Sequence, residues 1–223
     1  MIITIDGPVG SGKSSAARLI AKRLNIYYLN TGLLYRGVAY VFLYKLRKPI
    51  TVLADSNFCT EEDLKTLDSL KYVYLDGEPH LFYREQNLTP HLMSSELSQA
   101  ASMVSANSCI REKLLPLQRE VGKNYDIVAE GRDCGSVVFP NADFKFFLTA
   151  SLEERARRVV NDKKRKLTGQ ELEVVKKELE VRDERDKNRK VSPLQVPQNA
   201  IIIDNTDMSL LETVEEILRQ IKK

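Results

Sequence analysis

The apolar positions of this chain fall into short continuous runs separated by longer amphipathic segments. The short runs have the length of buried strands, and most of the segments between them repeat apolar residues every three or four positions, as helices packed on a sheet do. Continuous apolar strands that alternate with helices are typical of parallel sheets covered on both faces. The pattern predicts an α/β protein with a five-stranded parallel sheet and helices on both faces. The predicted strands are residues 2–6, 27–29, 125–130, 144–148 and 200–204.

Several helix ends can be predicted from capping residues. The first helix carries an apolar stripe over residues 16–24 and is closed by Asn25. The Thr31 side chain is expected to cap a helix over about residues 33–46. Four later helices are expected where a serine or threonine stands three positions before an acid. They are predicted to begin at Thr60, Ser151, Thr168 and Ser209, and the last keeps Leu210, Val214, Ile217 and Ile221 on one face.

Residues 49–110 break the alternation of strand and helix. Residues 71–75 and 80–84 are separated by Asp76-Gly77, which predicts a β-hairpin with a tight turn. A third short strand is expected near residues 87–89, and residues 95–115 are expected to be mostly helical. This segment is therefore interpreted as an insertion that carries a short antiparallel sheet beside the parallel core.

Length and composition describe one ordinary globular domain. The chain has 223 residues, with 43% hydrophobic and 29% charged residues, which is enough for a single well-filled core and demands no second domain. The net charge of +3 gives no reason to expect nucleic acid as a partner. Residues 151–192 alone hold 14 Lys/Arg and 10 Asp/Glu, so the basic excess belongs to one segment.

Cysteine and histidine usage narrows the chemistry. Cys59, Cys109 and Cys134 are far apart and lack a Cys-x-x-Cys pairing, which favours a reducing compartment over disulfides or zinc. The two histidines, His80 and His91, have no partner at ligand spacing, so a histidine-based metal site or triad is not expected. Neither a membrane-spanning run nor a secretion signal is present, and the protein is expected to be cytoplasmic, without a membrane partner.

The first predicted strand leads directly into a phosphate-binding loop. Glycine, four residues and then Gly-Lys-Ser between a strand and a helix form this motif in both letters and context. Glycines allow positive φ and a close approach of backbone N–H groups to a polyphosphate, and the following helix aims its positive end at the same oxygens. Lys13 is expected to reach the β- and γ-phosphates, and the Ser14 hydroxyl to hold Mg²⁺. The triphosphate site is predicted to comprise Gly7, Pro8, Val9, Gly10, Ser11, Gly12, Lys13, Ser14 and Ser15.

The loop alone does not say what happens to the triphosphate. The Asp-x-x-Gly and Asn-Lys-x-Asp patterns of GTPases do not occur in the chain, and motor and transporter ATPases are normally larger. An insertion after the second strand and an arginine-dense helical segment after the fourth favour a small-molecule kinase, in which these two parts close over acceptor and donor.

Three further sequence motifs indicate which molecule accepts the phosphoryl group. Together with the phosphate-binding loop they are spread over nearly the whole chain. They are residues 30–36 (Asn-Thr-Gly-Leu-Leu-Tyr-Arg), 130–140 (Glu-Gly-Arg-Asp-Cys-Gly-Ser-Val-Val-Phe-Pro) and 182–189 (Arg-Asp-Glu-Arg-Asp-Lys-Asn-Arg). With these strings in this order, the chain resembles the bacterial cytidylate kinases. The chain departs from that family's usual residues at Asn30, Met93, Glu130 and Cys134.

The resemblance implies a phosphoryl transfer from ATP, with Mg²⁺, to CMP and dCMP by a monomeric enzyme. It implies a core of about residues 1–34, 112–155 and 192–223, an acceptor-binding insertion of about 35–111, and a helical lid of about 156–191. Lys13, Arg132, Arg182 and Arg189 are then expected to be catalytic. The implied CMP-binding residues are Thr31; Arg36 and Arg132 for the phosphate; Ser102, Arg111 and Asp133 for the cytosine; Asp186 for the ribose; and the lid arginines Arg182 and Arg189.

Chemistry supports this assignment independently. Cytosine offers an amino donor at N4 and acceptors at N3 and O2, so a carboxylate and a guanidinium are its complementary partners. The acceptor phosphate has its second pKa near 6 and is largely a dianion at neutral pH, so it needs no general base. Arginine suits the transferring group because its planar fork pairs with phosphate oxygens at fixed geometry.

Two alternatives remain open from the residues alone. One is another small P-loop kinase that acts on a different monophosphate or small-molecule acceptor. The other is a binding protein in which residues 163–166 (Lys-Lys-Arg-Lys) contact RNA, although little aromatic interleaving surrounds that run. The charged residues of 182–189 could likewise form a solvated, ion-paired helix face.

Overall fold

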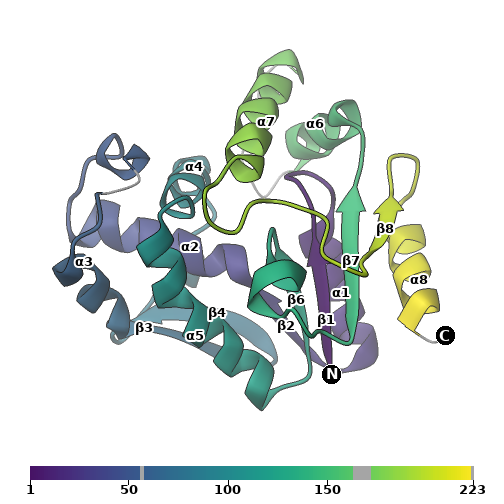
Figure 1. The fold of residues 1–223 in the computed structure, drawn as a ribbon, viewed down its shortest axis with the longest axis horizontal. Helices are drawn as coiled ribbons and strands as arrows, with labels where there is room; N and C mark the ends of the chain where they lie inside the picture. The colour runs from purple at the N-terminus through teal and green to yellow at the C-terminus, as the bar shows by residue number, and fades with distance from the viewer. Residues whose placement is uncertain (56–57, 163–171, 222–223) are drawn as a thin grey trace. The chain divides into compact units, whose positions relative to one another are not determined.

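The computed structural model describes residues 1–55, 58–162 and 172–221 (Figure 1). The chain divides into two compact units. The core unit comprises Met1–Leu29 and Val121–Lys223, and the inserted unit comprises Asn30–Glu120.

The core unit is built on a five-stranded sheet in the order β2-β6-β1-β7-β8. β1 pairs in parallel with both β6 and β7, and β7 pairs in parallel with β8, which confirms the predicted parallel sheet. Asp6 at the end of β1 stands beside Gly131 of β6. The carboxyl ends of the central strands therefore meet at one edge. The strands are β1 (Ile2–Asp6), β2 (Tyr27–Asn30), β6 (Ile127–Gly131), β7 (Phe144–Thr149) and β8 (Ile201–Asp204).

Helices cover both faces of this sheet. Ile3 and Ile5 of β1 join a buried cluster with residues of α1 (Lys13–Leu24) and α8 (Leu210–Ile221). Successive strand side chains point to opposite faces, so Thr4 and Asp6 lie on the other face. There β1 packs against a π-helical turn, η5 (Cys134–Val138).

Most predicted caps in the core unit are present. Asn25 closes α1 in the left-handed conformation, with φ of 55°, and Ser209 and Glu212 form the reciprocal bonds of a capping box before α8. The prediction that Leu210 belongs to the buried apolar face of α8 is wrong. Leu210 is the first residue of the helix, and 43% of it is exposed to solvent.

Two helices follow β7 and form a small apolar cluster of their own. α6 (Leu152–Asn161) and α7 (Leu172–Lys187) bury Ala156, Val159, Val175 and Leu179 together with Val9. The Ser151 hydroxyl caps α6 by accepting from the Glu154 N–H, as predicted. The Ser151 N–H donates to the Thr206 hydroxyl and not to the Glu154 side chain, so the prediction of a complete capping box is wrong. The predicted helix start at Thr168 and the basic run at 163–166 lie outside the described residues.

The inserted unit carries a separate three-stranded antiparallel sheet, as predicted. β3 (Leu70–Leu75) and β4 (Glu78–Tyr83) form the hairpin, and β5 (Gln86–Asn87) is the short third strand. Asp76 and Gly77 both have positive φ, 52° and 78°, which matches the twist that a tight hairpin turn requires. The α-helices that begin in this unit are α2 (Thr31–Tyr40), continued by the π-helical turn η1 (Val41–Lys45), and α3 (Glu61–Thr66), α4 (Ser95–Val104) and α5 (Ser108–Asn124), whose residues from Val121 on belong to the core unit.

Two helix predictions in the inserted unit need correction. The side chain that caps α2 is Asn30, which accepts from the Leu33 N–H at 3.1 Å, and Thr31 is the first helical residue. The predicted helix over residues 95–115 is two helices, because the chain leaves the first at Ser105 and the Asn107 side chain caps the second by accepting from the Ile110 N–H at 3.1 Å. The cap at Thr60 is confirmed as a complete capping box.

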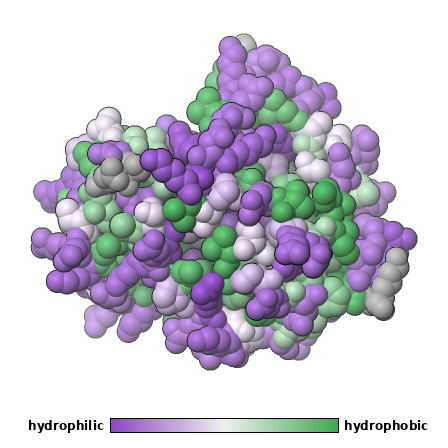
Figure 2. All heavy atoms as spheres, in the orientation of Figure 1, coloured by the Kyte–Doolittle hydropathy of each residue, from purple (hydrophilic) through white to green (hydrophobic). Residues whose placement is uncertain are grey.

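Polar residues cover most of the face drawn in Figure 2, including α7 at its top. None of the helices among the described residues is long and apolar enough to cross a membrane.

The cap assignment at Asn30 leads to a test. Asn30→Ala is expected to lower the free energy of unfolding by about 1 kcal/mol, because it leaves the Leu33 N–H without its acceptor. Asn30→Asp retains an acceptor of equal capping strength and serves as the control. Urea unfolding of the two variants measures the difference. Equal stability of Asn30→Ala and the parent protein would contradict the assignment.

Candidate active site

The phosphate-binding loop joins β1 to α1 at the carboxyl edge of the sheet. Gly10 and Gly12 have φ of 79° and 85°, a region that side chains with a Cβ rarely adopt. A Cβ on Gly7 would lie 2.1 Å from the Leu148 carbonyl oxygen, so the loop also needs glycine for space. The loop therefore has the backbone geometry that exposes successive N–H groups to an anion.

Lys13 begins α1 and turns back over the loop. Its ammonium group donates to the Pro8 carbonyl at 2.7 Å, and only 4% of the residue is exposed. Burial, together with the positive charges of Arg132 and Arg182, lowers the pKa of Lys13 to about 7, against the opposing effect of Glu130. A negatively charged ligand at this position would restore the protonated form.

Ser14 and Glu130 together offer oxygen ligands of the kind that Mg²⁺ prefers. The Ser14 hydroxyl donates to Glu130 Oε1 at 2.9 Å, and the Tyr28 hydroxyl donates to the same oxygen at 3.1 Å. Glu130 is the penultimate residue of β6 and is 5% exposed. Mg²⁺ usually takes one or two protein oxygens and keeps several waters, so these residues fit the metal. From the sequence, Glu130 is the acid at the end of an apolar strand, where ligands are expected, and a departure from the family, but it is not predicted as a metal ligand.

Asp6 is a second buried carboxylate that the sequence did not single out. Its two oxygens accept from the backbone N–H groups of Cys134 and Gly135, at 2.8 and 2.7 Å. Complete burial raises the pKa of Asp6 to about 7, and these two hydrogen bonds oppose the rise. Asp6 thus anchors the segment that carries Arg132 and Asp133 to the end of β1.

The buried side of α7 changes from apolar to acidic along the helix. Val175 and Leu179 are followed, at helical spacing, by Asp183 and Asp186, all of them buried. These carboxylates meet guanidinium groups: Asp183 pairs with Arg155 at 2.7 Å. The C-terminal end of α7 is therefore held by ion pairs rather than by apolar packing.

Asp186 gathers three arginines that the sequence had assigned to the site. It pairs with Arg132, whose Nε lies 2.9 Å from Asp186 Oδ2. Burial alone would raise the pKa of Asp186, but the charges of Arg132, Arg182 and Arg189 hold it below its usual range. The structure therefore brings the predicted catalytic arginines together around one carboxylate, and Arg132 and Arg182 also act on Lys13. Such a cluster of positive charge is suited to phosphate groups.

The inserted unit holds four further predicted acceptor residues, Thr31, Arg36, Ser102 and Arg111. Arg36 on α2 donates to the Leu92 carbonyl at 2.8 Å and to the Ser98 hydroxyl at 3.1 Å. Ser98 lies one turn before Ser102 on α4, so both hydroxyls belong to one side of that helix. The sequence had missed Ser98.

Arg111 is 5% exposed and lies over an aromatic ring. Its guanidinium carbon is 5.2 Å from the ring centroid of Tyr35, and its Nη1 donates to the Ser105 carbonyl at 3.1 Å. A buried, oriented guanidinium of this kind can present a fixed edge to a base. Thr31, the first residue of α2, is also buried, whereas Met93 is half exposed. Asp133, the third predicted base-reading residue, belongs to the core unit.

Comparison with known proteins identifies the family. A family model described as cytidylate kinase matches residues 3–223. The cytidylate kinase of Caldanaerobacter subterraneus subsp. tengcongensis is 41% identical over 221 residues, which cover 99% of this chain and 94% of that protein. The chain belongs to the cytidylate kinase family. The cytidylate kinase of Pseudothermotoga lettingae is 39% identical over 217 residues, covering 97% of this chain and 92% of that protein.

Solved structures agree with the fold of this cytidylate kinase family member. Shikimate kinase from Bacteroides thetaiotaomicron aligns with a TM-score of 0.50 at 11% identity, over all of this chain and 99% of that chain. At this identity the likeness concerns the fold alone.

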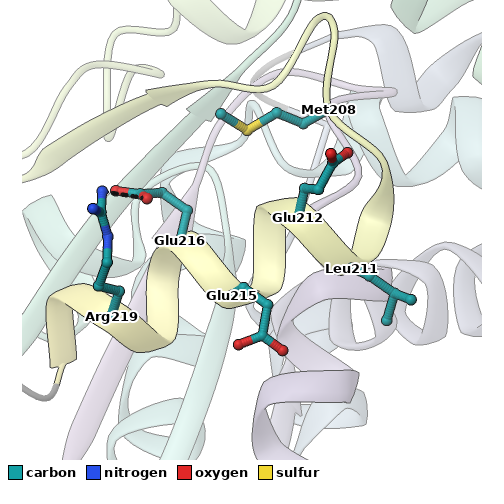
Figure 3. Close-up of a pocket in the computed structure, with 6 residues that line it drawn as sticks. All are labelled: Met208, Leu211, Glu212, Glu215, Glu216 and Arg219. Carbon is teal, nitrogen blue, oxygen red and sulfur yellow. Dashed lines mark hydrogen bonds and ion pairs between the residues drawn. The ribbon is translucent and has the colours of Figure 1, made fainter.

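A surface hollow on α8, of about 470 Å³, lies outside the predicted site (Figure 3). Its carboxylates would repel phosphate groups, so it is not a candidate for either nucleotide of a cytidylate kinase. It is lined by Met208, Leu211, Glu212, Glu215, Glu216 and Arg219.

The lowered pKa of Lys13 predicts a pH dependence of stability. Between about pH 7, the folded value, and pH 10.5, the ordinary value, the unfolded chain binds a proton at Lys13 that the folded chain does not. The free energy of unfolding should therefore rise with pH in this window, by on the order of 1 kcal/mol per pH unit at most, relative to Lys13→Met. Urea unfolding at several pH values measures it. Lys22→Met, at an exposed position of α1, is the control, and parallel curves for the parent and Lys13→Met would contradict the prediction.

Proposed function

We propose that this chain transfers the γ-phosphoryl group of ATP to the phosphate of CMP, giving ADP and CDP, and that it accepts dCMP in the same way. The observation that carries the proposal is the positive cluster of Lys13, Arg132, Arg182 and Arg189 around Asp186, beside a phosphate-binding loop, in a member of the cytidylate kinase family. Phosphoryl transfer is accelerated mainly by positioning and charge stabilisation, and this cluster can supply both.

On the donor side, the residues of the loop would hold the polyphosphate. The backbone N–H groups of the loop, which Pro8 lacks, would surround it, and Lys13 would exchange the Pro8 carbonyl for a phosphate oxygen. Ser14 and Glu130 would hold Mg²⁺, which shields the phosphate charges when it is bound.

On the acceptor side, arginines would orient a nucleophile that is already charged. Arg36 and Arg132 hold the acceptor phosphate, whose second ionisation is largely complete at neutral pH, so no side chain needs to remove a proton. Arg182 and Arg189 neutralise the charge that spreads over the transferring group. Asp186 accepts from Arg132 in this structure and would turn to the ribose when the phosphate takes its place.

Base recognition would use one carboxylate and one guanidinium. Asp133 is 4% exposed and would accept from the N4 amino group of cytosine, while Arg111 and Ser102 serve its acceptor edge. Uracil has an oxygen at position 4, which a carboxylate repels. The assigned residues all come from one copy of the chain, which fits a monomer, and the substrates are metabolites of the cytoplasm, where we place the reaction.

An acceptor panel tests the function. ADP release would be measured with MgATP and CMP, dCMP, UMP or AMP in parallel. We expect kcat/KM for CMP and dCMP to exceed that for UMP and AMP by about tenfold or more, given about 1–3 kcal/mol per bidentate base contact. Equal turnover of UMP or AMP would point instead to a small P-loop kinase of another specificity. RNA binding that falls steeply with salt, without any nucleotide turnover, would favour a binding protein.

Asp133→Ala is predicted to reduce selectivity rather than donor binding. The ratio of kcat/KM for CMP over UMP should fall by about tenfold, because the N4 amino group loses its acceptor and uracil loses its repulsion. KM for ATP should stay within about twofold of the parent value. Glu85→Ala removes an exposed acid in the turn between β4 and β5, outside the predicted nucleotide-binding residues, and is the control. An unchanged CMP preference in Asp133→Ala would contradict the base-reading assignment.

A further inference from the structure

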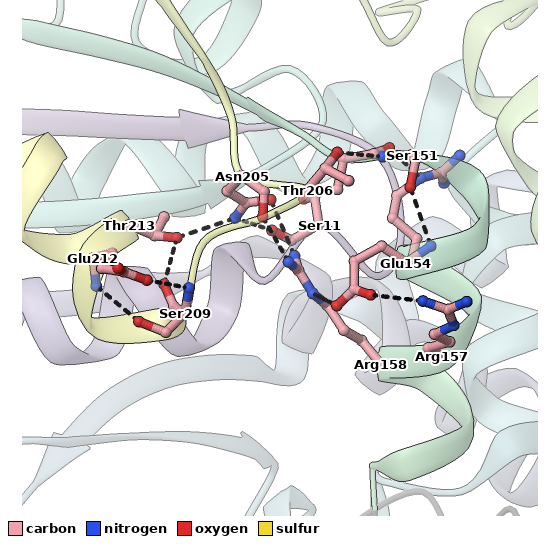
Figure 4. A network of polar contacts seen from close by, with 12 residues as sticks. Ser11, Ser151, Glu154, Arg157, Arg158, Asn205, Thr206, Ser209, Glu212 and Thr213 are labelled. Carbon is pink, nitrogen blue, oxygen red and sulfur yellow. Dashed lines mark hydrogen bonds and ion pairs between the residues drawn. The ribbon is translucent and has the colours of Figure 1, made fainter.

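Two side chains from outside the phosphate-binding loop hold alternate carbonyl groups of the loop. Arg155, on α6, donates from Nη1 to the Val9 carbonyl at 3.1 Å. Asn205, directly after β8, donates from Nδ2 to the Ser11 carbonyl at 3.0 Å (Figure 4). Both donors are more than nine-tenths buried, with exposed fractions of 7% and 3%. Neither residue belongs to the sequence motif that defines the loop.

Fixing these carbonyls also fixes the N–H groups of the glycines. A trans peptide unit is planar, and its C=O and N–H point in opposite directions. The Val9 carbonyl and the Gly10 N–H share one such unit, and the Ser11 carbonyl and the Gly12 N–H share another. With the carbonyls held on the outside, the two N–H groups point away from Arg155 and Asn205. Glycine itself provides no such restraint, because its backbone is free to rotate.

Each of the two donors is itself held in place. Arg155 pairs with Asp183 of α7 at 2.7 Å, and its Nε donates to the Ala150 carbonyl at 3.1 Å. Buried charges are tolerated when they are paired and hydrogen-bonded in this way. Gly10 packs directly on this arginine, since a Cβ on Gly10 would lie 2.9 Å from the Arg155 Cβ. Arg155 therefore has little freedom to leave the Val9 carbonyl.

The orientation of the Asn205 amide follows from a guanidinium fork. Arg158 donates from Nη1 to Asn205 Oδ1 at 3.0 Å and from Nη2 to the Asn205 carbonyl at 2.7 Å (Figure 4). Turning the amide by half a rotation would place its NH₂ group against Arg158, donor against donor. The NH₂ group is therefore committed to the Ser11 carbonyl, with the Thr213 hydroxyl 3.4 Å away.

We propose that Arg155 and Asn205 are positioning residues that orient the Gly10 and Gly12 N–H groups for the polyphosphate of the donor. The proposal rests on the proposed function. Preorganised donors contribute more to phosphate binding than donors that must be ordered at the moment of binding. Because both residues act on the backbone under the phosphates, their effect does not depend on the base of the nucleotide.

Asn205→Asp is the sharpest test. It keeps Oδ1 for Arg158 but replaces the NH₂ donor with an oxygen that repels the Ser11 carbonyl. Titration calorimetry with MgATP and with inorganic tripolyphosphate should show both dissociation constants raised by about tenfold and by similar factors, while KM for CMP stays within about twofold. Asn199→Asp makes the same change at an exposed position before β8 and is the matched control.

Three results would overturn the proposal. One is equal affinity of Asn205→Asp and Asn199→Asp for both ligands. Another is a loss confined to ATP with tripolyphosphate binding intact, which would make Asn205 a contact of the base. The third is an equal loss for CMP, which indicates a general defect of the fold. A parent protein that binds tripolyphosphate but does not phosphorylate CMP would instead overturn the proposed function.

Arg155→Lys provides a second variant, in case the thermal unfolding midpoint shows that Asn205→Asp does not fold. It keeps the charge that faces Asp183 but replaces the planar fork by a single ammonium group. The same parallel loss of MgATP and tripolyphosphate affinity is expected, and its absence in the folded variant would contradict the role of Arg155.

Discussion

The site depends on keeping several positive charges close together where a phosphate chain has to fit. Lys13 is buried and lies near the positive charges of Arg132 and Arg182, and its burial and these charges together lower its pKa. The fold moderates this positive charge with carboxylates of its own: Asp186 pairs with Arg132, and Glu130 acts on Lys13 from the end of β6. These acids make the positive cluster compatible with a folded chain, since an unpaired buried charge is strongly destabilising.

The same constraint explains why the scaffold around the loop is polar. A wholly apolar surround would bind the loop tightly but would leave its outward carbonyls without donors, at a cost of about 1–3 kcal/mol for each buried group. Arg155 and Asn205 supply those donors from α6 and from the turn after β8. Val9 combines apolar packing with a polar contact. Its side chain joins the apolar cluster of α6 and α7, and its carbonyl accepts from Arg155.

Local patterns in the sequence were enough for the strands, the hairpin and the letters of the phosphate loop. They failed where two neighbouring residues competed for one role, as with Asn30 and Thr31 at the start of α2, because both side chains can cap a helix. They also failed for Asp6, Arg155 and Asn205. The partners of these residues lie 128 or more positions away in the chain, so neither spacing nor periodicity could reveal the contacts. The roles assigned to the nucleotide-binding residues rest on the family and on chemistry.

Helix α7 is held by apolar contacts along its first part and by ion pairs at its C-terminal end. Its apolar contacts end at Leu179, and beyond them Asp183 and Asp186 hold the helix by ion pairs to Arg155 and Arg132. Buried ion pairs add little net stability, because desolvation offsets most of their attraction. Under the proposed function, a phosphate group that pairs with Arg132 would take the place of Asp186, whereas Asp183 holds Arg155, which donates to the Val9 carbonyl. The helix that carries Arg182 is thus held by one pair next to the phosphate loop, Asp183–Arg155, and by another, Asp186–Arg132, that the proposed reaction would open.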